Sequence, residues 1–146
     1  MSWVSDELIQ VNLRFGQRRL IMKTILFISA NKILGQGLSA AIMSKPGIGF
    51  QWKAQFNYAQ AVVGADIFHA DMVILDVVDQ TDMENATEIC QSLRQCNREI
   101  KILLLVRPEQ AAVRKKAVDI QNIGLIDNFV FYDSSLIYLL AKLEAL

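Results

Sequence analysis

The chain has 146 residues with fifteen basic and fifteen acidic side chains, so its formal net charge is zero. This length suits one domain around a single core, and a hydrophobic content of 53% is typical of a globular protein. The balanced charge gives no electrostatic basis for direct nucleic acid binding or for attraction to an acidic membrane surface. No apolar run reaches the roughly 20 residues that a membrane-spanning helix needs. The first residues also lack the pattern of a signal peptide, so we expect a cytoplasmic protein.

The residue types that usually carry metal or phosphate chemistry are sparse. Cys90 and Cys96 fall on different faces of one predicted helix, which indicates two reduced thiols rather than a disulfide. His69 is the single histidine and has no second ligand at a metal-binding spacing. The stretch 34–39 contains two glycines but lacks the third glycine of a dinucleotide fingerprint and the lysine of a phosphate loop. We therefore expect no metal, no cofactor and no enzymatic activity.

Residues 1–21 differ in pattern from the chain that follows. Val4, Leu8, Val11 and Phe15 recur at helical spacing between polar and charged residues, which predicts a short amphipathic helix. Met22 then begins a second stretch that can open the domain without the preceding residues. We assign residues 1–21 to an N-terminal extension, either a loosely packed appendage or a docking or dimerising helix, and 22–146 to one α/β domain.

Strands and helices alternate through this domain. Continuous apolar runs or period-two alternation predict strands, and apolar residues at helical spacing predict helices. The expected strands are 23–29, 50–56, 71–78, 100–106 and 128–132, and the expected helices are 33–44, 58–64, 81–95, 109–118 and one from 136 to at least 143.

Helical crossovers of this length require parallel strands joined by right-handed connections. We therefore expect a doubly wound, flavodoxin-like sheet of five parallel strands in the order 2-1-3-4-5, with helices on both faces.

One carboxylate stands out within this pattern. Met72 to Leu75 and Val77 form a continuous apolar run, typical of a strand that is buried on both faces of a parallel sheet. Asp76 interrupts this run near its carboxyl end. In open α/β sheets, ligands and chemistry are placed at that edge, so Asp76 is a candidate functional residue.

Five segments in register resemble the receiver domain of bacterial two-component response regulators. Met72–Asp76 is similar to the strand that ends in the family's phosphoacceptor aspartate. The other segments are similar to its first strand, the helix after the phosphoacceptor, the fourth strand, and the last strand and helix; they are 23–28, 88–94, 101–105 and 124–143. The resemblance implies a signalling domain with Asp76 in the phosphoacceptor position.

The chain departs from the receiver pattern around Asp76. Phosphorylation of an aspartate requires Mg²⁺, which receivers hold with two acids after the first strand. The matching positions are Ser29 and Ala30, with Asn31 next. The family's hydroxyl residue at the end of strand four matches Val106, and its lysine near the end of strand five falls at or next to Tyr132, with no lysine nearby. The resemblance therefore implies a degenerate pocket, in an atypical receiver that has lost Mg²⁺-dependent phosphorylation.

Three acids near this edge each have two alternative roles. Asp79 is either a solvated loop acid or a replacement metal ligand, and Asp82 is either a helix-start acid or a second such ligand. Asp76 is either a relict carboxylate that is hydrogen-bonded to loop amides, or a ligand-binding or switching group.

The last helix predicts an interaction surface. Ile137 and Tyr138 lie beside its core stripe and widen the apolar surface toward solvent. In receivers, the face formed by the fourth helix, the fifth strand and the fifth helix serves in dimerisation and output, and Tyr132 and Tyr138 lie near the matching face. We expect a protein partner, an output domain or a homodimer there.

Three functions follow from the sequence. The leading one is a non-enzymatic signalling module, a pseudo-receiver that acts through protein–protein interaction. The second is a receiver that is still phosphorylatable on Asp76. The third is a small flavodoxin-like enzyme or ligand-binding protein that uses the polar groups of the same edge: Ser29, Asn31, Asp76, Asp79 and Tyr132.

Overall fold

The structure, a computed structural model, describes residues 22–44 and 49–146. The predicted amphipathic extension, residues 1–21, lies outside the described residues and stays a prediction. The strands are β1 (Lys23–Ile28), β2 (Phe50–Gln55), β3 (Met72–Val77), β4 (Lys101–Val106) and β5 (Asn128–Phe131). The helices are α2 (Lys32–Met43), the 3-10 turn η1 (Tyr58–Gln60), α3 (Ala61–Ile67), α4 (Gln80–Cys96), α5 (Ala111–Asn122) and α6 (Leu136–Ala145).

The five strands form one parallel sheet in the order β2-β1-β3-β4-β5, which confirms the predicted order. β3 is central and all six of its residues are buried, as its apolar composition predicts. Asp76 lies opposite Leu105 in the β3–β4 register, one residue before the end of its strand. The sheet thus places this carboxylate at the edge where all five strands end.

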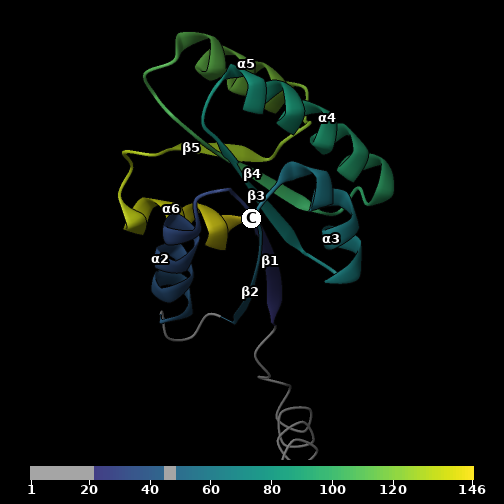
Figure 1. The fold of residues 1–146 in the computed structure, drawn as a ribbon, viewed down its shortest axis with the longest axis vertical. Helices are drawn as coiled ribbons and strands as arrows, with labels where there is room; N and C mark the ends of the chain where they lie inside the picture. The colour runs from purple at the N-terminus through teal and green to yellow at the C-terminus, as the bar shows by residue number, and fades with distance from the viewer. Residues whose placement is uncertain (1–21, 45–48) are drawn as a thin grey trace, which may run out of the picture.

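Helices cover both faces of the sheet, as predicted (Figure 1). α2 and α6 pack on one face around buried side chains that include Ile25, Phe27 and Leu143. α3, α4 and α5 pack on the other face around a second cluster that includes Leu75 and Met83. Each buried aliphatic side chain contributes roughly 1.5–3 kcal/mol relative to exposure, so the two clusters dominate the stability of the fold.

Side-chain caps set where several helices begin. Asn31 caps α2 by accepting a hydrogen bond from the backbone N–H of Leu34 at 3.0 Å. Ser135 caps α6 in the same way, by accepting a hydrogen bond from the backbone N–H of Tyr138 at 3.1 Å. These caps explain why each helix starts directly after the loop at the carboxyl edge.

Two predicted helices differ from the structure at their ends. The helix expected at 58–64 begins as the turn η1 and continues as α3 to Ile67. The helix expected at 109–118 starts at Ala111 and runs to Asn122, because buried Ile120 extends its apolar face. Gly124 follows with φ +80°, a conformation that favours glycine and ends the helical run.

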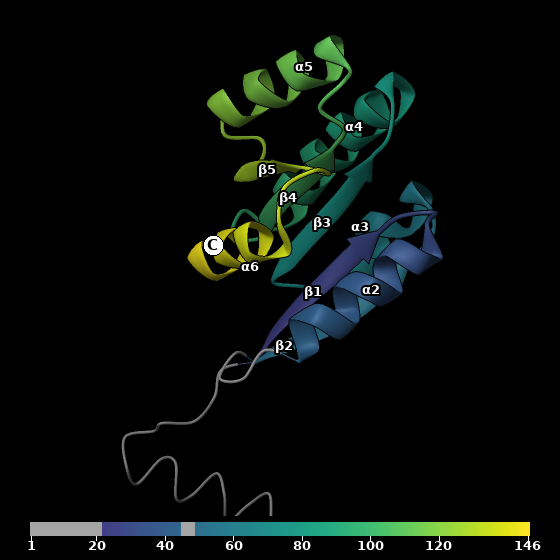
Figure 2. The same cartoon turned by 90° about the vertical axis from the view of Figure 1, so that its left-hand side faces the viewer.

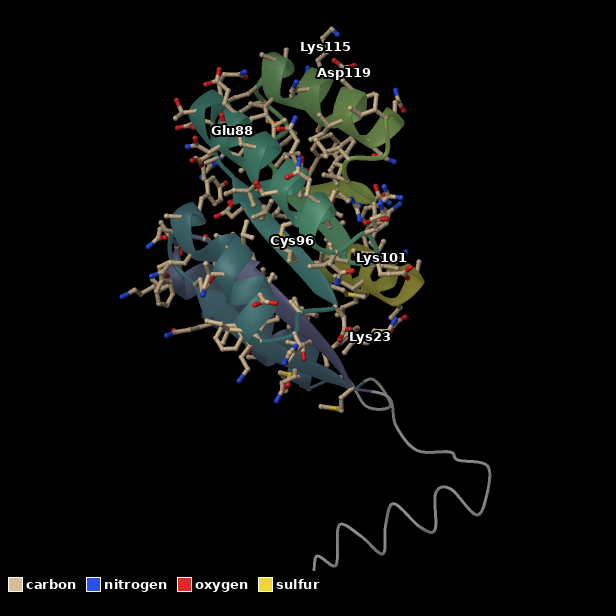
Figure 3. The ribbon with its side chains drawn as sticks, turned by 90° about the vertical axis from the view of Figure 1, so that its right-hand side faces the viewer. Lys23, Glu88, Cys96, Lys101, Lys115 and Asp119 are labelled. Atoms are coloured by element: carbon tan, nitrogen blue, oxygen red, sulfur yellow. The ribbon has the colours of Figure 1, made fainter. Side chains whose placement is uncertain are left out.

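The two thiols lie apart, as expected from their spacing. Both lie on α4. Cys90 is buried on the inner side of the helix, whereas Cys96 is exposed at its C-terminal end, near the start of β4 (Figure 3). Within the described ranges, none of the helices has both the length and the apolar character required to cross a bilayer.

Candidate functional site

Asp76 is held at the carboxyl end of β3 with only 5% of its surface exposed. Its Oδ2 accepts a short hydrogen bond of 2.5 Å from the hydroxyl of Ser29, which follows β1. The Ser29 oxygen in turn accepts a hydrogen bond from the backbone N–H of Asn31 at 3.0 Å. The other carboxyl oxygen, Oδ1, is buried without a hydrogen-bond partner among the described residues. The site therefore contains a buried acceptor whose hydrogen-bonding capacity is only half used.

The surroundings of Asp76 favour its protonated form. Burial raises the pKa of its carboxyl above the ordinary value, and the hydrogen bond from Ser29 partly counteracts this. The negative charge of Asp82 raises the pKa further, while the guanidinium of Arg107 lowers it. Desolvation is the largest of these effects, so the carboxylate is costly to keep charged.

Tyr58 is a site residue that the sequence analysis missed. Its phenol, on the turn after β2, donates a hydrogen bond to the backbone carbonyl oxygen of Asp76. Burial, followed by the negative charges of Asp82, Asp76 and Asp79, raises the pKa of the phenol, which keeps it neutral. Tyr58 therefore fixes the backbone of Asp76.

Arg107 is the second missed residue, and it supplies a cation where the sequence analysis found none. It directly follows β4, and its guanidinium lies 5.0 Å from the ring centroid of Tyr132. This stacking holds the long side chain beside the end of β5. Its Nε is buried without a hydrogen-bond partner among the described residues. Its position in the sequence could have identified it. Arg107 directly follows the strand that pairs with β3, so it lies at the same edge of the sheet as Asp76.

These groups line a cavity of about 520 Å³. Of the predicted site residues, Ser29, Ala30, Asn31, Asp76 and Tyr132 lie on its lining. Val106 instead belongs to the buried cluster under α3, α4 and α5. Asp82, which the sequence offered as an alternative metal ligand, also lies on the lining, and the polar groups that the structure adds are Asn57, Tyr58, Asn85 and Arg107. The cavity thus combines carboxyl, hydroxyl, amide and guanidinium groups with aromatic rings.

The two acids after β3 serve as helix caps. Asp79 Oδ1 accepts a hydrogen bond from the N–H of Asp82 at 2.8 Å, and Asp82 Oδ2 accepts one from the N–H of Val78 at 2.9 Å. Gln110 Nε2 donates to the carbonyl oxygen of Val78 at 3.0 Å. Both polar groups of the Val78 backbone are therefore engaged, and the loop after Asp76 is fixed by three side chains.

The predicted interface residues fall into two places. Tyr132 is half-buried between the cavity and the core under α2 and α6. Ile137 and Tyr138 lie on α6 and are 79% and 47% exposed. Tyr138 borders a depression of about 530 Å³ that also includes Gln121 of α5 and residues 128–131 of β5. We refer to this surface of three elements as the α5–β5–α6 face.

Comparison with known proteins shows similarity at the level of structure. No family model matches the chain, and no curated protein matches its sequence. A two-component response regulator of the LuxR family from Aurantimonas sp. superposes with a TM-score of 0.68 at 19% identity, covering 86% of this chain and 84% of that one.

Two further solved structures agree with this result. A chemotaxis response regulator of Vibrio cholerae gives a TM-score of 0.65 at 15% identity, covering 86% of this chain and 98% of its own. The signal receiver domain of an HD domain-containing protein from Pseudomonas fluorescens gives 0.65 at 16% identity, covering 84% and 85%. At this identity the likeness establishes the fold alone: the chain has the flavodoxin-like fold of response-regulator receiver domains.

Proposed function

We propose that this protein is a pseudo-receiver, a signalling module that acts through protein–protein contacts without Mg²⁺-dependent phosphorylation of an aspartate. The receiver fold supports the signalling role, and the surroundings of Asp76 support the loss of the phosphorylation chemistry. The observation that carries the proposal is the buried hydrogen bond between the Ser29 hydroxyl and Asp76 Oδ2.

The oxygen donors around Asp76 do not fit Mg²⁺. This ion prefers octahedral oxygen ligands and in receivers binds to carboxylates beside the phosphoacceptor. Here Ser29 offers a neutral hydroxyl that already donates to Asp76, and Ala30 offers a methyl group. Asp82 uses Oδ2 to cap α4. Across residues 22–44 and 49–146, no set of three or more acidic, histidine or cysteine side chains is arranged to hold a metal ion.

The cation that does lie at the cavity cannot fulfil the metal's role. Arg107 is directed over the ring of Tyr132, and its Nε makes no hydrogen bond with the described residues. Mg²⁺ in a phosphorylating receiver bridges the acceptor carboxylate and the phosphoryl oxygens, which a single stacked guanidinium does not reproduce. Arg107 therefore offsets the charge of Asp76 without building a phosphoryl-transfer site.

A titration with Mg²⁺ and beryllofluoride, a mimic of the aspartyl phosphoryl group, tests the proposal. We expect no saturable shifts of the backbone amides around Asp76 in the NMR spectrum of the wild-type protein. The double variant Ser29→Asp/Ala30→Asp restores both acids and is the positive control, with Asp76→Asn as the negative one. Saturable wild-type shifts that disappear in Asp76→Asn would show a working receiver.

Output through a protein contact is the second part of the proposal. The α5–β5–α6 face combines an edge strand with exposed apolar side chains on α6, a composition that often marks an interface. We propose that this face binds a partner protein, an output domain or a second copy of the chain.

Small-ligand binding is the alternative function that one observation favours. The cavity of about 520 Å³ is lined by Asp76, Arg107 and the polar side chains of Ser29, Asn31 and Tyr58, a set of groups that suits a polar ligand. Native mass spectrometry of the purified protein tests this alternative. A bound small molecule that is retained by the wild type and lost in Asp76→Asn would favour it.

A further inference from the structure

The solvent-facing side of α2 is unusual because it carries a single charge, that of Lys32 at the first position of the helix. Its residues recur at helical spacing and are all exposed; they are Ile33, Gln36, Gly37, Ala40 and Met43, which we call the α2 outer face. Ile33 is 82% and Met43 is 52% exposed. By contrast, Glu88 of α4 and Lys115 and Asp119 of α5 project outward from their helices (Figure 3). Since a solvated helix face normally carries charged residues, the α2 outer face has the composition of a contact surface.

The shape of this face suits a second helix. A Cβ atom added at Gly37 would meet no atom of the described residues within 4 Å, so the backbone of α2 is open to close approach there. Beside the face runs a groove of about 350 Å³ between α2 and β2, lined by Gly35, Ser39, Ala40, Trp52 and Phe56 among others. The groove adds aromatic and apolar surface next to the small residues.

The first described strand begins near the C-terminal end of this helix. The N–H of Lys23 donates to the carbonyl oxygen of Gly49 at 2.8 Å, so β1 begins beside the segment that connects α2 to β2. Figure 2 shows the start of β1 and the C-terminal end of α2 at the same end of the molecule. The start of β1 therefore lies at the end of the molecule where the α2 outer face ends.

The sequence of residues 4–15 matches that face in spacing and length. Its apolar stripe, Val4, Leu8, Val11 and Phe15, has steps of four, three and four residues, and the first two of these steps also relate Ile33, Gly37 and Ala40 of the α2 outer face. Twelve helical residues span about 18 Å, which is also the length of α2. Residues 16–21 can bridge up to about 20 Å, enough to join such a helix to Met22.

We propose that residues 4–15 form an amphipathic helix that packs parallel to α2 on the α2 outer face of the same chain. In this arrangement Leu8 lies over Gly37 and Val11 over Ala40. Glu7, on the flank of the stripe, comes toward the end of α2 that carries Lys32. This docked helix covers the groove beside the cavity and leaves the α5–β5–α6 face free, so it goes beyond the proposed output contact.

Disulfide trapping in the full chain tests the proposal. The variant Leu8→Cys/Gly37→Cys is made in a Cys96→Ser background, because Cys96 is exposed whereas Cys90 is buried. We expect mild oxidation to give an intramolecular disulfide at least tenfold faster than in the matched control Asp6→Cys/Gly37→Cys, since Asp6 falls on the opposite side of the helix. Equal rates would overturn the proposal, and a disulfide between two chains would assign the face to a second copy.

A second variant checks the same contact without a crosslink. Gly37→Arg improves the helix propensity of α2, and a Cβ atom at this exposed position meets no neighbouring atom of the described residues within 4 Å, but the arginine side chain would displace a docked helix. We expect trypsin to cleave after Arg14 several-fold faster in Gly37→Arg than in the wild type. An unchanged rate of cleavage would contradict the docking of residues 4–15.

Discussion

At the scale of single residues, Asp76 destabilises the folded chain when it is charged. Its pKa is raised in the folded state, so the folded chain binds this proton more tightly than the unfolded chain does. Stability contributed by the protonated carboxyl is therefore lost as pH rises through the folded-state pKa. We expect Asp76→Asn, which keeps an oxygen for Ser29, to stabilise the fold by about 1 kcal/mol at neutral to mildly alkaline pH. Urea unfolding across pH measures this.

The pH dependence separates this effect from a change in packing. The gain should shrink as pH falls below the folded-state pKa of Asp76, because the wild-type carboxyl is then neutral as well. Asp66→Asn, at an exposed position on α3, is the matched control and should give no comparable gain. An equal gain at acidic and alkaline pH would argue against a buried charge as the cause.

Arg107 has a separate role that can be measured at the same carboxyl group. Because its guanidinium lowers the pKa of Asp76, Arg107→Met should raise the pH at which Asp76 titrates, and Arg107→Lys should preserve most of the wild-type behaviour. Carboxyl carbon NMR of Asp76 follows the titration directly. A titration that does not move in Arg107→Met would mean that the guanidinium is too well solvated to act on Asp76.

At the scale of elements, Arg94 joins three parts of the fold at the edge opposite the cavity. Its guanidinium donates to the carbonyl oxygens of Leu125, at 3.1 Å, and of Ile100, and it pairs with Asp127 at 2.8 Å. Asp127 Oδ2 also accepts the N–H of Ile102 at 2.8 Å. The end of α4, the start of β4 and the loop before β5 are thus held by one side chain.

Arg94→Met should lower the free energy of unfolding by about 2–4 kcal/mol, because it leaves a half-buried carboxylate and two carbonyl groups without their donor. Lys115→Met is the matched control. Its ion pair with Asp119 is largely exposed, and its loss should cost about 0.5 kcal/mol or less. Urea unfolding of both variants gives the comparison, and similar losses in the two would refute a special role for Arg94.

At the scale of the whole molecule, apolar patterns were sufficient to predict the sheet and the place of Asp76. The runs that became β1, β3 and β4 are buried on both faces, and a parallel sheet is the arrangement that buries them. The contribution of Tyr58 could not be predicted in this way, because its phenol reaches from the turn after β2 to a backbone carbonyl on β3, and these two strands are not neighbours in the sheet. Arg107 was missed for a similar reason: its effect depends on stacking against Tyr132, at the end of a different strand.

The same patterns led to the prediction of a contact on α6, which concerns the assembly of the molecule. Ile137 is 79% exposed, and Tyr138 borders the depression that joins α5, β5 and α6. The ring centroids of Phe129 and Phe131, on the edge strand of this face, lie 5.6 Å apart. Burial of these side chains between two copies would remove apolar surface from water and cover an open strand edge.

We therefore expect the wild-type protein to form a dimer and Tyr138→Glu to weaken it at least tenfold, because the new carboxylate would be desolvated in the contact. Size-exclusion chromatography with light scattering over a range of concentrations measures the mass. Ile67→Glu, at an exposed apolar position on α3, is the matched control and should dimerise like the wild type. If Tyr138→Glu and Ile67→Glu weaken the dimer equally, the contact between the two copies lies outside the α5–β5–α6 face. If the wild-type chain stays monomeric at every concentration, the α5–β5–α6 face does not bind a second copy, and its partner is a different protein.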